Sequence, residues 1–390
     1  MSPYITYPSF MLFVYVFVAI FAGATALTHV IIVTGIIRSR LRENIPSQPT
    51  DIPHSLISII IPAHNEEKNL PFLLESLKKQ TDSHFEVIFI NDRSTDSTKQ
   101  IIENFQKNHS FPVHIISLSK NPHPVNPKQF ALEKGIAAAH GNFYLFTDAD
   151  CILPPHWVEY YRNAFSESTA GVIFGPVYTV SGKGFLKKYQ TFDHVYRYHY
   201  TVGSAGMGIP SGGFGNNLAV RRKALDAIGG YGTVDYSVTE DAALITAINK
   251  RTGYCIRALT SSAVTVQAHP QKSWKNLVRQ ELRWSSGAFF SPYPETRGGY
   301  SAVMLYLAGG VFALPFIPFV PVLSWISIST FCSMFSVAFS GGLLLRLKPR
   351  EYWLYVIQSI LFSGIMYLYV DALALFRAKI TWKGHTLEAS

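Results

Sequence analysis

Phe146-Thr147-Asp148-Ala149-Asp150-Cys151 is the stretch around which the rest of the chain is organised. It follows a short apolar run, residues 142–146, that has the composition of a buried β-strand. Two carboxylates one residue apart can hold a hard divalent cation, which takes oxygen ligands and shares them with water and phosphates. The same spacing occurs in ordinary turns, where an Asp side chain accepts from the backbone. The surrounding sequence has to decide between the two interpretations.

The composition points to a chain that is partly dissolved in lipid, because 48% of its 390 residues are hydrophobic and the mean hydropathy is positive. Residues 10–37 carry no charge, and a helix of that length, at about 1.5 Å per residue, spans the roughly 30 Å hydrocarbon core. We therefore expect residues 1–45 to form an N-terminal transmembrane anchor. Its C-terminal end is expected in the cytoplasm because basic residues follow it, namely Arg38, Arg40 and Arg42.

A second apolar region, residues 301–376, predicts about three further transmembrane helices. Residues 301–345 are long enough for two spans, with prolines at the bend, and residues 352–376 fit another. Four spans would leave the basic residues of the tail, residues 377–390, outside the cell, against the charge rule. An interfacial or re-entrant piece within residues 301–345 would instead place the tail in the cytoplasm. The sequence leaves both topologies open.

Net charge and cysteine content argue against a nucleic-acid-binding protein and against a protein built on disulfides or zinc. The net charge is +9, but the sequence has no basic stripe interleaved with stacking aromatics. Arg and Lys residues next to the apolar segments account for much of the charge, so no nucleic-acid partner is expected. The three cysteines are odd in number and widely spaced, which favours neither a disulfide framework nor a zinc site.

Between the apolar regions, residues 46–300 alternate strand-like and helix-like segments, which predicts one α/β domain on a mostly parallel sheet. Short β-branched runs at residues 56–61, 85–90 and 113–117 read as its first strands. Residues 273–290 predict an amphipathic interfacial helix just before the second apolar region.

Polar side chains follow several of these strands. Ala63, His64 and Glu66 come after the first, and Asp92 after the second. Ligands of open α/β sheets bind at the carboxyl ends of strands, although helix capping explains some of the same residues. Lys128 is expected in the first turn of a helix, where the dipole disfavours a cation; it indicates either an anionic partner or a solvated surface lysine.

These segments occur in a recognisable order. Residues 62–66, residues 91–96, the Asp148/Asp150 pair, Thr239-Glu240-Asp241 and Gln280-Glu281-Leu282-Arg283-Trp284 follow one another along the chain. This order resembles the membrane-bound family 2 glycosyltransferases of the GT-A fold, which include cellulose, chitin and hyaluronan synthases and ceramide glucosyltransferase. The resemblance covers about residues 55–290 and implies a GT-A (Rossmann-like) catalytic domain.

The resemblance implies a donor site for a UDP-sugar. Asp92 would contact the uracil, and Ala63, His64 and Glu66 would line the base and ribose pocket, although the family often has Tyr or Phe in place of His64. Lys128 would lie near the nucleotide or its diphosphate. Asp148 and Asp150 would serve the ribose and a Mg²⁺ or Mn²⁺ ion, with Asp150 the direct ligand.

The resemblance also implies an acceptor site. Asp241, next to Glu240, would take the proton from an acceptor hydroxyl in a single displacement that inverts the anomeric configuration. Gln280, Arg283 and Trp284 share one helix face by spacing and would clamp the acceptor and the diphosphate. Gly213 and Phe214, in a glycine-rich loop, would border the acceptor.

The sequence thus predicts a multi-pass protein of the cytoplasmic (inner) membrane with its catalytic domain in the cytoplasm. We expect an inverting, metal-dependent glycosyltransferase that acts on a lipid or a lipid-linked saccharide. A processive polysaccharide synthase is the alternative, but the C-terminal spans offer few ionisable residues for a polymer channel. A sugar nucleotidylyltransferase would need a glycine-rich basic loop after the first strand, where this chain has Pro62-Ala63-His64-Asn65-Glu66. A catalytically inactive scaffold is a further alternative, but it would not need the acids that are present.

Overall fold

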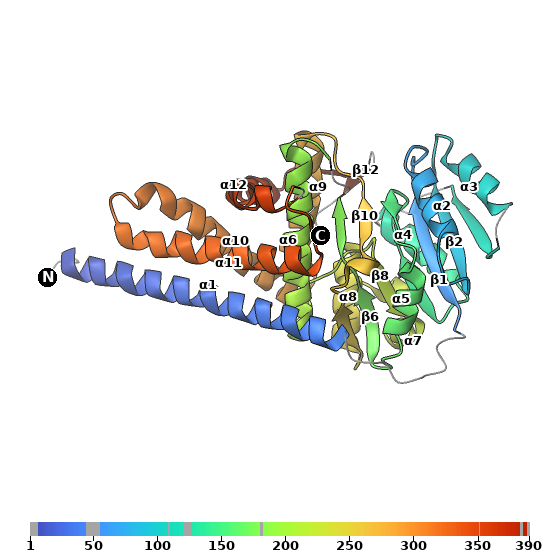
Figure 1. The fold of residues 1–390 in the computed structure, drawn as a ribbon, viewed down its shortest axis with the longest axis horizontal. Helices are drawn as coiled ribbons and strands as arrows, with labels where there is room; N and C mark the ends of the chain where they lie inside the picture. Colours follow the sequence, from blue (N-terminus) through green and yellow to red (C-terminus); the bar gives the residue numbers. More distant parts are fainter. Residues whose placement is uncertain are drawn as a thin grey trace.

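The structure, a computed structural model, describes residues 7–43, 55–107, 110–119, 126–179, 182–350, 352–382 and 385–387. In Figure 1 the α/β domain lies on one side of a long central helix, α6 (Phe185–Gly206), and the long apolar helices extend from its other side. The chain therefore divides into a sheet-based part and a helical part that meet at α6.

The main sheet has seven strands in the order β3-β2-β1-β4-β8-β6-β9. The first four run parallel to one another, whereas β8 is antiparallel to both β4 and β6. The strands are β1 (Ile57–Ala63), β2 (Phe85–Asp92), β3 (Val113–Leu118), β4 (Phe143–Phe146), β6 (Ala170–Phe174), β8 (Leu218–Arg221) and β9 (Cys255–Ala258). A smaller sheet contains β5 (Cys151–Ile152), β7 (Val177–Thr179) and β10 (Val266–Ala268). The predicted α/β class with a mostly parallel sheet is confirmed.

Alternate residues of β1 enter two different cores. Ile57, Ile59 and Ile61 pack with α2 (Leu70–Lys78), α3 (Thr98–Gln106) and α5 (Trp157–Ala164). Ile60 belongs to the core on the other face, with α4 (Pro127–Ala137), α7 (Arg222–Ala227) and α8 (Glu240–Arg251). Because both faces are covered, these strands read as continuous apolar runs rather than as an alternating pattern.

The strand order places the polar segments at one edge. From β1 the chain goes to β2 and β3 on one side and then returns to β4 on the other, so a switch point lies between β1 and β4. Ligands of open α/β sheets bind at such a point, outside the carboxyl ends of the strands. The segments after β1, β2 and β4 all lie at this edge.

The N-terminal helix α1 (Tyr7–Glu43) crosses α6 with its backbone in close contact. A Cβ on Gly203 would lie 2.5 Å from the carbonyl oxygen of Ile32, and a Cβ on Gly206 would lie 2.0 Å from that of Gly35. Only glycine permits this approach. The end of α1 is also fixed, because Glu43 accepts hydrogen bonds from Tyr160 and from the main chain of Thr260 and Ser261.

Among the described residues, four helical segments are long and apolar enough to cross a membrane: Phe10–Glu43, Pro294–Phe316, Pro321–Leu344 and Trp353–Leu375. They contain α1, α10 (Pro294–Ala313), α11 (Ser324–Leu344) and α12 (Val356–Leu375). The expected interfacial helix is α9 (Trp274–Phe289), and the chain ends in a hairpin of β11 (Ile380–Trp382) and β12 (His385–Leu387). Apolar residues of α1, such as Leu12 and Phe13, are exposed.

Helix α12 differs from the other three because it stays beside the α/β domain along its whole length. The residue just before it, Tyr355, packs on α6, where Lys188 lies over its ring. Its middle contacts the start of α9, with the rings of Phe362 and Trp274 5.0 Å apart. Just beyond its end, Arg377 lies over Phe290, the residue that follows α9. In Figure 1, α12 is foreshortened whereas α1 extends across the view.

Candidate active site

The loops after β1 and β2 are joined by hydrogen bonds that fix the first part of the site. The main-chain N–H of Asn65 donates to Oγ of Ser94 at 3.1 Å, and that of Thr95 donates to Oδ1 of Asn65 at 2.8 Å. Asn65 adopts a positive φ of 54°, which Asn tolerates better than most residues. The structure thus brings together Ala63, His64 and Glu66 with the loop that begins at Asp92.

Asp92 is the residue expected to contact the uracil, and the structure gives it a partner within the chain. Arg93 donates to both of its carboxylate oxygens, from Nε to Oδ1 at 2.7 Å and from Nη2 to Oδ2 at 3.0 Å. His64 lies beside this pair, with Nδ1 2.5 Å from the Asp92 carbonyl oxygen. A base that bound here would meet a carboxylate whose orientation Arg93 already fixes.

The N-terminus of α4 is tied to the segment before α8, although the two are far apart in sequence. Oδ1 of Asn126 caps α4 by accepting from the N–H of Lys128 at 3.0 Å, and its amide donates to the carbonyl of Ser237 at 2.9 Å. Gln129 donates to the carbonyl of Val234 at 3.1 Å. These bonds hold Lys128 next to Glu240.

Lys128 is the cation at the centre of the site. Its Nζ lies 2.7 Å from Oδ1 of Asp148 and 3.1 Å from Oε1 of Glu240. Burial lowers the pKa of this lysine, but the charges of the two acids outweigh burial and raise it above its usual value. Lys128 is therefore a charged bridge between the acid after β4 and the acid that opens α8.

Asp241, the next residue, is held by two main-chain donors. Oδ2 accepts from the N–H of Gly215 and Oδ1 from that of Ala242, both at 2.8 Å. Burial and the neighbouring Glu240 raise its pKa to about 6 despite these bonds. Gly215, Glu240 and Asp241 line a small cavity whose other walls are apolar: Leu132, Phe146, Leu218, Tyr231 and Leu244.

The two acids of the opening stretch offer oxygen ligands at the carboxyl edge of the sheet. The Asp148 side chain is one-third exposed and already neutralised by Lys128. Oδ1 of Asp150 accepts from the Cys151 thiol at 3.8 Å, and the same sulfur accepts from the Asn216 amide at 3.6 Å. An all-oxygen donor set beside water suits Mg²⁺ or Mn²⁺.

The predicted acceptor residues Phe214 and Trp284 both lie near His194, an α6 residue that was not predicted for the site. The His194 ring is 6.2 Å from that of Phe214 and 5.9 Å from that of Trp284. Arg283 lies close to the segment before α8, with Nη1 3.4 Å from the carbonyl of Val238. Gln280 is half-buried on the same helix.

Gly213 is in close contact with α8. A Cβ at this position would lie 2.6 Å from Cδ1 of Ile245, so a side chain here would require the Ile245 side chain to shift.

Sequence reasoning missed a buried ionic cluster behind the acceptor residues. Glu281 is fully buried and pairs with Arg197, which also binds Asp193 through Nε. Tyr367 of α12 donates to Oδ1 of Asp193 at 2.5 Å, and the Arg197 guanidinium lies 5.5 Å from the Trp284 ring. An acid on the apolar face of α9, beside Leu277 and Leu282, was the available signal, because a buried acid requires a partner.

A mostly parallel sheet of this order, with acids at its carboxyl edge and a small second sheet beside them, is the arrangement of the GT-A fold. The model of glycosyl transferase family 2 matches residues 58–229, and that of glycosyl transferase family group 2 matches residues 145–375, more than half of the chain. The chain belongs to the family 2 glycosyltransferases.

Relatives and solved structures agree with this assignment. A probable glycosyltransferase, YdaM, from Bacillus subtilis is 28% identical over 63% of this chain, which spans 57% of that relative's length. A dolichyl-phosphate beta-glucosyltransferase from Trichomonas vaginalis is 33% identical over 28% of the chain and 34% of its own length. The mannosyltransferase PcManGT from Pyrobaculum calidifontis, solved with GDP-Man and Mn²⁺, has a TM-score of 0.51 at 17% identity, covering 90% of this chain and 99% of that one.

Proposed function

We propose that this protein is an inverting glycosyltransferase that moves a sugar from a UDP-sugar to a hydroxyl of a lipid or lipid-linked saccharide, on the cytoplasmic face of the membrane. The observation that carries the proposal is the bridge made by Lys128. It joins Asp148, at the donor edge of the sheet, to Glu240, which is adjacent to the proposed base. Donor and acceptor chemistry therefore share one ionic cluster.

The residues of this cluster have complementary tasks in a single displacement. Asp241 takes the proton of the attacking hydroxyl, and its raised pKa brings its basicity closer to neutral pH, where a general base works best. Lys128 offers its ammonium to the diphosphate as negative charge develops there. Asp148 and Asp150 hold Mg²⁺ or Mn²⁺, which when bound neutralises charge on the leaving UDP.

The charges beside the base favour a neutral acceptor. Glu240 and Asp241 are adjacent acids, and an acceptor that carried its own negative charge would be repelled by them. A hydroxyl avoids that repulsion and requires the base that Asp241 provides. The aromatic group formed by Phe214, His194 and Trp284 offers apolar surface beside the membrane helices for a lipid or a sugar.

For the membrane topology we propose that α1, α10 and α11 cross the bilayer and that α12 lies at its cytoplasmic surface. The residues that flank α12, Tyr355 and Arg377, contact α6 and Phe290, and these contacts support a position of both ends on the side of the α/β domain. Its outer face is apolar and exposed at every fourth residue, namely Ile357, Leu361, Ile365 and Tyr369. Three crossings place the basic residues before and after α12 on the same side, in agreement with the charge rule.

A panel of radiolabelled UDP-sugars, offered to membranes that contain the protein, tests the proposal. We expect label from one of these donors to enter organic-extractable lipid, only with Mg²⁺ or Mn²⁺ present. Label in high-molecular-weight polymer would instead identify a processive synthase. Incorporation from GDP-sugars and not from UDP-sugars would overturn the donor assignment.

A further inference from the structure

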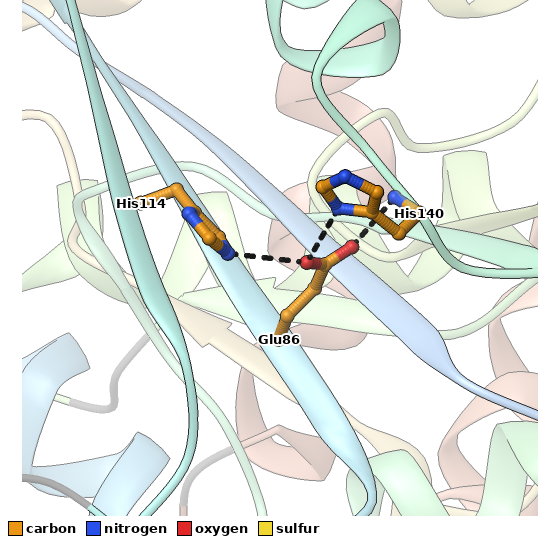
Figure 2. Close-up of side chains that lie close together, drawn as sticks. All are labelled: Glu86, His114 and His140. Atoms are coloured by element: carbon orange, nitrogen blue, oxygen red, sulfur yellow. Dashed lines mark hydrogen bonds and ion pairs between the residues drawn. The ribbon is translucent and has the colours of Figure 1, made fainter.

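Glu86, His114 and His140 form a second group of metal-ligating side chains, outside the candidate active site (Figure 2). Glu86 is the second residue of β2, whereas Asp92 is the last residue of the same strand. At about 3.3 Å per residue the two positions are roughly 20 Å apart along the strand. The group therefore lies at the opposite edge of the sheet and cannot supply the ion that serves the diphosphate.

The carboxylate of Glu86 is held in place before any ligand arrives. The residue is 3% exposed, and its Oε1 accepts from Oγ of Ser58 at 2.6 Å and from the main-chain N–H of His140 at 2.7 Å. Ser58 is itself fixed, because its Oγ accepts from the N–H of Gly141 at 2.8 Å. These bonds occupy Oε1 and leave Oε2 directed at the two imidazoles.

The distances around Oε2 match the edges of a tetrahedral zinc site. Oε2 lies 3.2 Å from Nδ1 of His140 and 3.3 Å from Nε2 of His114. All three ligand atoms lie within 4.8 Å of one another. Zinc bonds of about 2.0–2.1 Å at tetrahedral angles separate neighbouring ligands by about 3.4 Å. As Figure 2 shows, both rings already point at the same carboxylate, and their exposed positions leave room for water as a further ligand.

We propose that Glu86, His114 and His140 bind Zn²⁺. Two imidazoles and one carboxylate suit zinc, whereas Mg²⁺ and Mn²⁺ prefer oxygen ligands alone, so this site and the Asp148/Asp150 pair select different metals. The three residues come from β2, β3 and the turn before β4. The ion joins the edge strand β3 and that turn to the centre of the sheet, and it stabilises the α/β domain without taking part in sugar transfer.

Zinc binding by the full chain, purified in detergent with any polyhistidine tag removed, tests the proposal. Equilibrium dialysis measures the affinity of the protein for Zn²⁺. Excess Mg²⁺ and UDP are present so that they occupy the donor site and Zn²⁺ does not bind there. We expect His114→Ala and His140→Ala each to weaken Zn²⁺ binding by about tenfold or more, since losing even an outer-shell partner costs 10- to 100-fold. Both histidines are exposed, so neither substitution opens a cavity in the core.

His156→Ala is the matched control. His156 pairs with Glu159 at 2.9 Å on the surface of α5, an imidazole and a carboxylate without the second imidazole. The His156→Ala variant should bind Zn²⁺ with the same affinity as the parent protein. Zn²⁺ should also raise the Tm of the parent and of the control but not of the other two variants. Unchanged zinc affinity in either His114→Ala or His140→Ala would mean that the group is only a set of ion pairs.

Discussion

The main-chain N–H of Gly215 donates to Oδ2 of Asp241 at 2.8 Å, so the glycine-rich loop aims the proposed base. A Cβ at position 215 would lie 3.2 Å from the Asp241 side chain. Because glycine has no Cβ, the loop can approach α8 this closely. Because the glycine-rich loop and Asp241 are joined directly, the position of the carboxylate depends on that loop.

Asp241→Asn should abolish sugar transfer and leave UDP binding intact. The amide keeps the acceptor for the Gly215 N–H but cannot take a proton, and loss of general-base catalysis costs about 10²- to 10⁴-fold in rate. Rates come from label incorporation and UDP affinity from calorimetry. Asp235→Asn, an exposed acid paired with Arg251, is the control and should retain the parental rate. A fully active Asp241→Asn protein would disprove the base assignment.

The raised pKa of Asp241 predicts an acidic limb in the rate profile. The carboxyl must be ionised to act, so kcat/KM should fall about tenfold per pH unit below about 6, not below the ordinary value near 4. The stability of the fold should change in the opposite sense. The folded chain keeps this proton up to about pH 6 and the unfolded chain loses it near 4, so this group's contribution falls as pH rises between those values.

The comparison of Asp241→Asn with the parent isolates that group. The variant cannot ionise here, so its Tm relative to the parent should rise from pH 4 to pH 6. A constant difference in Tm across this range would show that the pKa of Asp241 is not raised in the folded protein.

Lys128→Met should weaken UDP binding by about tenfold, or about 1.4 kcal/mol, because the ammonium no longer meets the diphosphate. The loss also leaves Asp148 and Glu240 without their shared cation. Lys134→Met, an exposed lysine of the same helix that lies over the Phe130 ring, is the matched control and should bind UDP as the parent does. Parental affinity in Lys128→Met would place the diphosphate elsewhere.

Arg197→Met should destabilise the protein by about 3 kcal/mol, because it leaves Asp193 and Glu281 buried without a cation. Arg197→Met combined with Glu281→Gln should recover part of that loss, since one buried acid is then neutral. Arg222→Met removes an exposed pair with Asp226 and should change the Tm little. If Arg197→Met melts at the parental temperature, the cluster does not hold α6, α9 and α12 together.

Much of the fold was predictable because it rests on local patterns. The apolar runs of β1, β2 and β4 and the uncharged stretch of α1 predicted the sheet class and the long N-terminal helix, since strands covered on both faces and helices suited to lipid are both continuously apolar. The position of Asp92, Asp148 and Asp150 at the carboxyl edge of the sheet was also predictable, because each lies at or just after the end of a strand. The roles of these acids stay predictions.

What the sequence could not supply depends on contacts between distant segments. Nothing near Lys128 indicates that its partner is Glu240, which comes much later in the chain. The cluster around Arg197 required α6, α9 and α12 to be placed together. The contacts of α12 with α9 also could not be read from the sequence, because its composition indicates only that it is long and apolar enough to cross a membrane.

Cysteine labelling decides whether α12 crosses the membrane. In a background in which Cys151, Cys255 and Cys332 are replaced, single cysteines are introduced by three substitutions: Glu75→Cys on α2, Phe319→Cys in the turn between α10 and α11, and Lys379→Cys after α12. Glu75 and Phe319 are both exposed, so each reports its own side of the membrane.

A membrane-impermeant maleimide is applied to sealed vesicles of each orientation. It should label Lys379→Cys in the same vesicles as Glu75→Cys, and it should label Phe319→Cys only in vesicles of the opposite orientation. That result follows if α12 lies on the surface beside α9, because its C-terminal end then stays with Phe290 on the side of the α/β domain. Labelling of Lys379→Cys together with Phe319→Cys would mean that α12 spans the bilayer and that the basic tail is outside.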